Sequence, residues 1–222
     1  MNIHYIHKLI TEGEHQQLDF KFEIADSRKI ARTFSAFANT DGGRLLIGVK
    51  DNGSISGIRT EEEKFMAEAA AGMYCKPPVP YTVKEWSVER KKVLEIIIGR
   101  GGQKPYFALD DEDKWQAYIR LHDKNIVANQ VIVRSWQRRS KPEGTYINYG
   151  PNERLLLEFL EKNEFITLPK LTRIANISNR RAQNILINFL ALDILEAVIT
   201  EKQVLYRLSP GFGKSEEQQL PK

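Results

Sequence analysis

The chain has 222 residues, of which 41% are hydrophobic, and it carries a formal net charge of +4. That length predicts one large domain, or one domain with a small partner, and the hydrophobic share is enough for a real core. The chain has no long apolar run, so no transmembrane helix is predicted, and its start lacks the pattern of a signal peptide. Because Cys75 is the only cysteine, neither an internal disulfide nor a cysteine zinc site is expected. We therefore expect a cytoplasmic protein without membrane contact, whose mild positive charge permits nucleic-acid binding without arguing for it.

The first strongly patterned stretch is a helix followed by a high density of turn residues. Ser27 can cap a helix whose apolar residues recur at helical spacing and which ends near Asn39. The segment 36–57 then reads AFANTDGGRLLIGVKDNGSISG, and its first glycine pair gives the backbone the freedom to reverse. The apolar run Leu45–Val49 predicts a buried strand, Asp51-Asn52-Gly53 predicts a hairpin turn, and SISGI after it predicts the partner strand.

The rest of the first half alternates helix and strand signals. Thr60 and Glu63 have the spacing of a capping box for an alanine-rich helix that stops before two consecutive prolines. Strands are predicted in YTVKEWSV (81–88), in KKVLEIIIG (91–99) and around QAYIRL (116–121), and a helix over Asn125–Trp136. This mixture predicts an α+β domain over residues 1–140.

A polar stretch rich in turn formers separates this domain from a smaller one, and we place a linker at residues 141–150. After it we expect three short helices, which start near Asn152, after Thr167 and after Ser178. Two strands follow, ILEAVIT and VLYRLS. Three helices and a hairpin resemble a winged helix-turn-helix domain, here residues 151–210, and the polar end, 211–222, is expected to be a disordered tail.

Several motifs of the first domain resemble the AlbA-type, Schlafen-like domain. They are EHQQLDFK (14–21), AFANTDGGRLLIGVKDNGSISG (36–57), KPYFA (104–108) and AYIRLHDKNIVAN (117–129), so the resemblance covers roughly residues 14–136. It implies an α+β fold that binds nucleic acid. Schlafen proteins resemble a pair of such lobes in one chain that line a groove for nucleic acid, so a chain with one lobe is expected to form a homodimer.

In Schlafen proteins the resemblance also implies a metal-dependent ribonuclease site of three carboxylates, which falls here on Glu14, Asp19 and Asp51. Clustered carboxylates hold Mg²⁺ or Mn²⁺, and the metal activates water and stabilises the charge that develops on phosphate. The family usually has glutamate at the position of Asp19, and no histidine in the matched motifs is placed as a general base. Asp51 is also an ordinary turn residue, and the other two acids can be solvated or can pair with Lys21. Both interpretations stay open, and no cofactor is expected beyond Mg²⁺ or Mn²⁺ in the nuclease case.

Basic and amide side chains predict where nucleic acid would be bound. The exposed face of the third helix in the second domain carries Arg180, Arg181, Asn184 and Asn188. In a winged helix-turn-helix this helix enters the major groove, where arginine pairs well with guanine and asparagine with adenine. A basic groove in the first domain is expected to use Lys21, Arg28, Lys29, Arg120 and Lys124. No P-loop motif occurs, so no ATP site is expected.

These observations predict a nucleic-acid-binding protein, a transcriptional regulator whose second domain reads double-stranded DNA, with RNA as a second candidate ligand. Two alternatives stay open. The first is a metal-dependent endoribonuclease of the Schlafen type that uses Glu14, Asp19 and Asp51. The second is a protein-interaction scaffold that contacts no nucleic acid. Converging carboxylates would favour the nuclease, and the lack of both converging acids and a basic groove would favour the scaffold.

Overall fold

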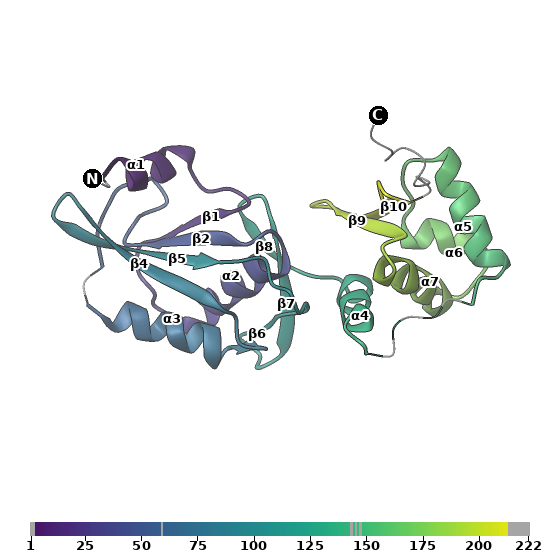
Figure 1. The fold of residues 1–222 in the computed structure, drawn as a ribbon, viewed down its shortest axis with the longest axis horizontal. Coiled ribbons are helices and arrows are strands. Elements are labelled where there is room, and N and C mark those ends of the chain that lie inside the picture. The colour runs from purple at the N-terminus through teal and green to yellow at the C-terminus, as the bar shows by residue number, and fades with distance from the viewer. Residues whose placement is uncertain (1–2, 59, 143, 145, 147, 213–222) are drawn as a thin grey trace, which may run out of the picture. The chain divides into compact units, whose positions relative to one another are not determined.

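The structure is a computed structural model that describes residues 3–58, 60–142, 144, 146 and 148–212. The chain divides into two compact units, Met1–Ala128 and Asn129–Lys222 (Figure 1). Within the described residues the first unit combines helices with two four-stranded sheets, and the second combines helices with a two-stranded sheet. The expected α+β class is thereby confirmed. Among the helices of the described ranges, none is both long and apolar enough to cross a membrane.

The first unit holds two sheets and the helices that cover them. Its elements are α1 (Ile3–Glu12), β1 (Leu18–Lys21), α2 (Ser27–Asn39), β2 (Gly43–Ile47), α3 (Glu62–Gly72), β3 (Cys75–Lys76), β4 (Tyr81–Val88), β5 (Lys91–Ile98), β6 (Phe107–Leu109), β7 (Trp115–Leu121) and β8 (Lys124–Val127). The first sheet has the strand order β1-β2-β5-β4, with β1 parallel to β2, and the second has the order β3-β6-β7-β8.

Helix α2 is buried because it packs against strands of both sheets, including β5 and β7. From Ile30 to Asn39 only Arg32 is not buried, which explains why this helix has apolar or small residues on nearly every side. The helix ends at Asn39, as predicted. Its cap differs from the prediction: Asp26 accepts a hydrogen bond from the Arg28 amide at 2.8 Å, so Ser27 is the first helical residue.

Strand β2 lies between β1 and β5, which confirms the predicted buried strand. Leu46 packs on the α1 side of the sheet, whereas Leu45 and Ile47 pack on the α2 side, as the two-residue period of a strand requires. The prediction that SISGI forms the partner strand was wrong. β5 occupies that edge of β2, and the residues after the turn make only an isolated bridge, Val49 to Ile55.

The strands predicted at 81–88 and 91–99 are confirmed as β4 and β5, which pair antiparallel, and the strand expected at 116–121 lies within β7. The helix predicted over Asn125–Trp136 was partly wrong, because Asn125 lies in β8 and pairs with Arg120. His122 adopts a φ of 56°, and the chain there reverses into a hairpin before any helix starts. The helix begins later, where the Asn129 side chain accepts a hydrogen bond from the Ile132 amide at 2.9 Å.

The second unit contains α4 (Gln130–Arg139), α5 (Pro151–Lys162), α6 (Leu168–Ile174), α7 (Asn179–Ala191), β9 (Leu195–Ile199) and β10 (Val204–Leu208). The two predicted caps are confirmed: Thr167 accepts from the Lys170 amide, and Ser178 accepts from the Arg181 amide, each at 3.3 Å. Strands β9 and β10 pair antiparallel as expected. The chain of the second unit therefore runs through α5, α6 and α7 into a hairpin.

The division between the two units lies before α4, earlier than the linker expected at 141–150. Helix α4 packs against α7, and its Val131 is part of the core of the second unit. Arg139 fixes the end of α4, because its guanidinium donates to the Leu190 carbonyl at 2.5 Å and to Asp193 at 2.6 Å. Residues 143, 145 and 147 of the predicted linker and 213–222 of the predicted tail lie outside the described residues.

Candidate functional site

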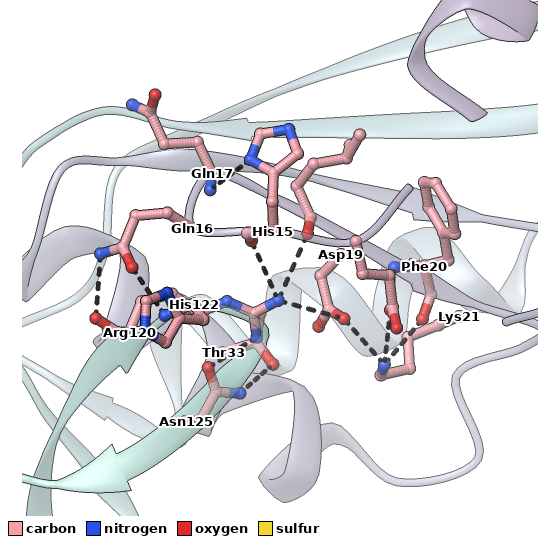
Figure 2. A network of polar contacts seen from close by, with 12 residues as sticks. His15, Gln16, Gln17, Asp19, Phe20, Lys21, Thr33, Arg120, His122 and Asn125 are labelled. Carbon is pink, nitrogen blue, oxygen red and sulfur yellow. Dashed lines mark hydrogen bonds and ion pairs between the residues drawn. The ribbon is translucent and has the colours of Figure 1, made fainter. Parts of the chain in front are cut away.

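Two of the three predicted carboxylates meet at β1. Alternation along this strand turns Asp19 away from α1, and the residue is only 3% exposed. Glu14 precedes the strand, and its Oε1 accepts a hydrogen bond from the Phe20 amide at 2.8 Å. Lys21 Nζ lies 3.2 Å from Asp19 Oδ1 and 3.9 Å from Glu14 Oε1, and Arg120 Nη2 lies 3.5 Å from Asp19 Oδ1 (Figure 2). The acidic pair is therefore held by two cations of the chain.

Arg120 is a buried structural residue, which corrects its prediction as a nucleic-acid contact. Its side chain is 1% exposed. The guanidinium donates to the carbonyls of His15 and Leu18 at 3.4 and 3.3 Å and to Asn125 Oδ1 at 3.0 Å (Figure 2). It also lies over the Phe37 ring, 5.2 Å from the centroid. A side chain enclosed in this way stabilises the fold, and a polymer in solvent cannot reach it.

The burial of Glu14 beside Asp19 raises the proton affinity of Glu14. Burial raises the pKa of Glu14 from its usual value near 4.5 to about 7, and the neighbouring Asp19 carboxyl adds to the rise. The Phe20 amide and the Lys21 ammonium oppose it. Glu14 therefore exchanges its proton near neutral pH.

The structure does not bring Asp51 to this pair. Asp51 is exposed in the turn after β2, where the Gly53 amide donates to the Lys50 carbonyl at 2.8 Å. In the described part of the chain, no group of three or more histidine, cysteine, aspartate or glutamate side chains is placed to hold a metal ion. The predicted set of Glu14, Asp19 and Asp51 thus does not fit a magnesium or manganese site, and Lys21 takes the place that a cation would have beside the acids.

A basic groove was also expected in the first unit, and four of its five predicted residues line one hollow of about 510 Å³. They are Lys21, Lys29, Arg120 and Lys124. The fifth, Arg28, instead pairs with Asp113 at 3.0 Å. Arg32 and Asn125 also line this basic hollow, and neither was predicted to, since Asn125 was expected in a helix and Arg32 belongs to no motif.

The predicted residues of the second unit line a different hollow, of about 340 Å³, on α7. Arg180, Arg181 and Asn184 are exposed, and Asn188 is half-buried and accepts a hydrogen bond from Arg138. The opposite face of α7 packs into the core of the unit, as the sequence pattern predicted. The structure therefore brings these four residues to one side of one helix.

The α7 hollow is positively charged. Neither Arg180 nor Arg181 forms an ion pair with any residue that the structure describes. Glu153 also lines the hollow, but it is only 7% exposed and its Oε2 accepts a hydrogen bond from the Gly150 amide at 3.1 Å. Both arginines lie in the first turn of α7, where the helix dipole adds partial positive charge. An anion is the ligand that this surface would favour.

Comparison with known families identifies the first unit. A family model described as Schlafen, AlbA_2 matches residues 14–129, just over half of the chain. The chain belongs to the Schlafen AlbA_2 family. The resemblance of the first domain is thereby confirmed, and the match ends before α4. No curated protein matches the chain.

Solved structures similar to this AlbA_2 chain are distant in sequence. The DIP2311 protein of Corynebacterium diphtheriae is 16% identical over 86% of this chain and 34% of its own, with a TM-score of 0.45. The N-terminal domain of a RecG-related protein of Nitrosomonas europaea, whose name refers to an ATP-dependent DNA helicase, is 21% identical over 56% of this chain and 95% of its own, with a TM-score of 0.39. The chain thus spans about a third of the length of the first of these proteins.

The Ala-Phe-Ala-Asn-Thr motif of the AlbA_2 domain has a structural role. The Asn39 amide nitrogen donates to the carbonyls of Tyr106 and Tyr118 at 2.7 and 2.9 Å, and its oxygen accepts from the Tyr106 amide at 2.8 Å. Thr40 Oγ1 accepts from the Arg120 amide at 2.9 Å. These bonds join the end of α2 to β7 and to the segment before β6, so the motif fixes the packing of the helix on the second sheet.

Proposed function

We propose that the protein binds nucleic acid and acts as a transcriptional regulator, with its second unit as a winged helix-turn-helix that reads duplex DNA. The observation that carries this proposal is that Arg180, Arg181, Asn184 and Asn188 line one hollow on α7. The order of α6, a tight turn, α7 and the β9–β10 hairpin supports the same assignment, because such domains place their third helix in the major groove.

The chemistry of the α7 surface suits DNA. Arginine can donate two hydrogen bonds to guanine, asparagine can exchange two with adenine, and each good contact contributes about 1–3 kcal/mol of discrimination. Ser178, whose hydroxyl caps the helix, orients the first turn that carries both arginines. The two arginines would therefore meet either base edges or phosphates at the point where α7 enters the groove.

The first prediction tests this surface. Replacing Arg180 and Arg181 together by alanine should weaken binding to a duplex of mixed sequence by about tenfold or more. It should also make the negative slope of log affinity against log salt shallower, by about 0.9 for each phosphate contact removed. Fluorescence anisotropy at several salt concentrations measures both quantities.

The matched control removes the same charge from another helix of the unit. Arg154 and Lys162 are exposed on α5, and neither lines the α7 hollow. The variant Arg154→Ala/Lys162→Ala should keep its affinity within about twofold, because exposed charges away from the contact contribute little. Equal losses in the two variants, or an unchanged salt slope in the first, would contradict the proposal and would favour a protein-interaction scaffold.

The endoribonuclease alternative has less support. It needs a third carboxylate beside Glu14 and Asp19, and the two acids already have Lys21 and Arg120 as charge partners. Incubating the protein with structured RNA and Mn²⁺, beside an Asp51→Asn variant, tests it directly. Cleavage by the parent and not by the variant would replace the regulator proposal.

The second prediction concerns assembly, since we propose that the protein acts as a homodimer that presents two α7 helices to a two-fold DNA site. Two large apolar residues, Phe65 of α3 and Met73 directly after that helix, are 68% and 71% exposed, and a second copy would remove them from water. Light scattering should give the dimer mass for the parent, and Phe65→Ser/Met73→Ser should shift it toward the monomer. A monomer at high micromolar concentration, with and without DNA, would contradict a dimer.

A further inference from the structure

Helix α4 presents a basic surface that the α7 proposal does not use. Residues 130–141, which cover this helix and the two residues after it, contain no aspartate or glutamate. Their cations are Arg134, Arg138, Arg139 and Lys141. The segment Val131–Val133 of the helix is buried, so the charged side chains extend from its remaining surface. The surface of α4 therefore carries positive charge that no acid of the same helix offsets.

The cations of α4 differ in whether an acid elsewhere in the unit neutralises them. Arg139 is paired with Asp193, whose carboxylate lies 2.6 Å from its guanidinium. Arg134 and Lys141 are exposed, and neither forms an ion pair with a residue in the described ranges. An anion from solvent can therefore approach these two side chains without displacing a carboxylate.

A side-chain contact places this surface beside the α7 hollow. Arg138 donates a hydrogen bond to Asn188 Oδ1, and Asn188 lines that hollow. Arg134 lies one helical turn before Arg138, on the same side of α4. Lys141 lies close after it, because the Lys141 amide donates to the Arg138 carbonyl at 3.3 Å. The polar face of α7 therefore continues, through Arg138, to the two unpaired cations of α4.

The length of the α7 face agrees with the dimensions of a DNA groove. In a helix-turn-helix the N-terminal residues of the recognition helix contact the base edges, and Arg180 lies in that part of α7. Asn188 follows it by eight residues, which is about 12 Å along the helix. The major groove is about 12 Å wide and about 8.5 Å deep. A point about 12 Å from the base contacts therefore reaches the phosphates that border the groove.

We infer that Arg134 and Lys141 bind the phosphate backbone of the duplex that α7 reads, so that α4 adds a contact outside the helices and hairpin of the winged helix-turn-helix. This inference rests on the proposed function of α7. Phosphate contacts add affinity and fix the position of a protein on the duplex without reading sequence. The helix dipole gives the C-terminal end of α4 partial negative charge, so the attraction must come from the two side chains.

The experiment measures binding of the full-length protein to two duplexes of equal length, one rich in A·T pairs and one rich in G·C pairs. Arg134→Gln/Lys141→Gln should weaken binding to both duplexes by the same factor, about tenfold. It should also make the negative slope of log affinity against log salt shallower by about 0.9 for each of the two contacts. Arg180→Ala/Arg181→Ala should in addition change the ratio of the two affinities, because arginine pairs well with guanine.

Two control variants separate the position of the charge from the charge itself. Arg134→Lys/Lys141→Arg keeps both cations and should bind within about twofold of the parent, because phosphate accepts lysine as well as arginine. Arg154→Gln/Lys162→Gln removes two exposed cations from α5 and should also stay within about twofold. Since Arg134 and Lys141 are exposed, the urea midpoint of Arg134→Gln/Lys141→Gln should match that of the parent.

The outcomes distinguish this inference from the α7 proposal. The inference is overturned if Arg134→Gln/Lys141→Gln binds as tightly as the parent, if it weakens binding to only one of the duplexes, or if the α5 control loses as much. An unchanged α4 variant beside a weakened Arg180→Ala/Arg181→Ala would overturn the inference and leave the α7 proposal standing. The reverse result would contradict α7 as the reading helix and, with it, a shared duplex. A parent that binds neither duplex would overturn both.

Discussion

Asn39 is a polar residue of the family motif whose role is structural. Its side chain is 2% exposed and bonds to backbone groups of Tyr106 and Tyr118. Buried backbone groups need partners, and leaving one without a partner costs about 1–3 kcal/mol. A single amide that satisfies several of them is difficult to replace, because no other side chain offers both a donor and an acceptor in that shape.

Glu14 is the residue from which we expect a clear dependence of stability on pH. Its pKa in the folded protein is about 7, above the usual value near 4.5, so the fold favours its protonated form. The stability that this difference contributes is fully present below about pH 4.5 and is lost as the pH rises through about 7. Glutamine can accept the same hydrogen bond from the Phe20 amide without titrating.

The third prediction follows from this sign. Between about pH 5 and pH 8 the free energy of unfolding of the parent should fall relative to that of Glu14→Gln. Urea unfolding at a series of pH values measures the difference. Parallel curves for the two proteins would show that Glu14 has the same proton affinity in the folded and unfolded chains.

At the scale of elements, the turn between α2 and β2 depends on close backbone approach. Gly42 has a φ of +73°, and a Cβ there would lie 2.7 Å from the Ile98 carbonyl oxygen and 2.9 Å from the Arg100 amide nitrogen. Both neighbours are backbone atoms at the end of β5, which cannot move without disturbing the sheet. The glycine therefore lets α2 reverse directly into the strand that pairs with β5.

The fourth prediction compares two glycines of the same unit. Gly42→Ala should lower the free energy of unfolding by about 2 kcal/mol or more, from the strained backbone and the close contacts together. Gly102→Ala should change it by less than about 0.5 kcal/mol, since no atom lies within 4 Å of a Cβ at that position. Urea unfolding of both variants provides the test, and equal losses would contradict this account of the turn.

At the scale of the whole molecule, α4 decides where the chain divides. Val131, Ile132 and Val133 of this helix are buried, and α4 packs against α7. Fully burying an apolar side chain of this size contributes about 1.5–3 kcal/mol. A second unit without α4 would therefore expose part of its own core.

The fifth prediction uses two fragments of the second unit. A fragment that starts at Asn129 should unfold cooperatively with a higher urea midpoint than a fragment that starts at Lys141, because only the longer one keeps α4 on α7. The full-length chain serves as the reference for the native transition. Equal midpoints for the two fragments would show that α4 contributes nothing to this unit.

The sequence by itself determined the local features of this protein. The caps at Thr167 and Ser178, the end of α2 at Asn39 and the antiparallel β4–β5 pair all follow from residues close together in the chain. Such features depend on backbone preferences and on side chains that bond within a few residues, which a sequence displays directly. The same holds for the AlbA_2 motifs, which are continuous segments, and for the Arg and Asn face of α7, which a helical period reveals.

Only the tertiary structure decided which distant segments meet. The residues near β2 in the sequence do not show that β2 pairs with β5 and not with SISGI. Which strand pairs with β2 depends on the total surface that each pairing buries, and this includes residues far away in the chain. Likewise Asp19 and Arg120 come from different sheets, and their meeting converts a predicted metal ligand and a predicted nucleic-acid contact into a buried ion pair. The charge of a residue cannot distinguish these roles. Whether a carboxylate or a guanidinium binds a ligand or forms a buried ion pair depends on its neighbouring groups and on its exposure to water, and the tertiary structure sets both.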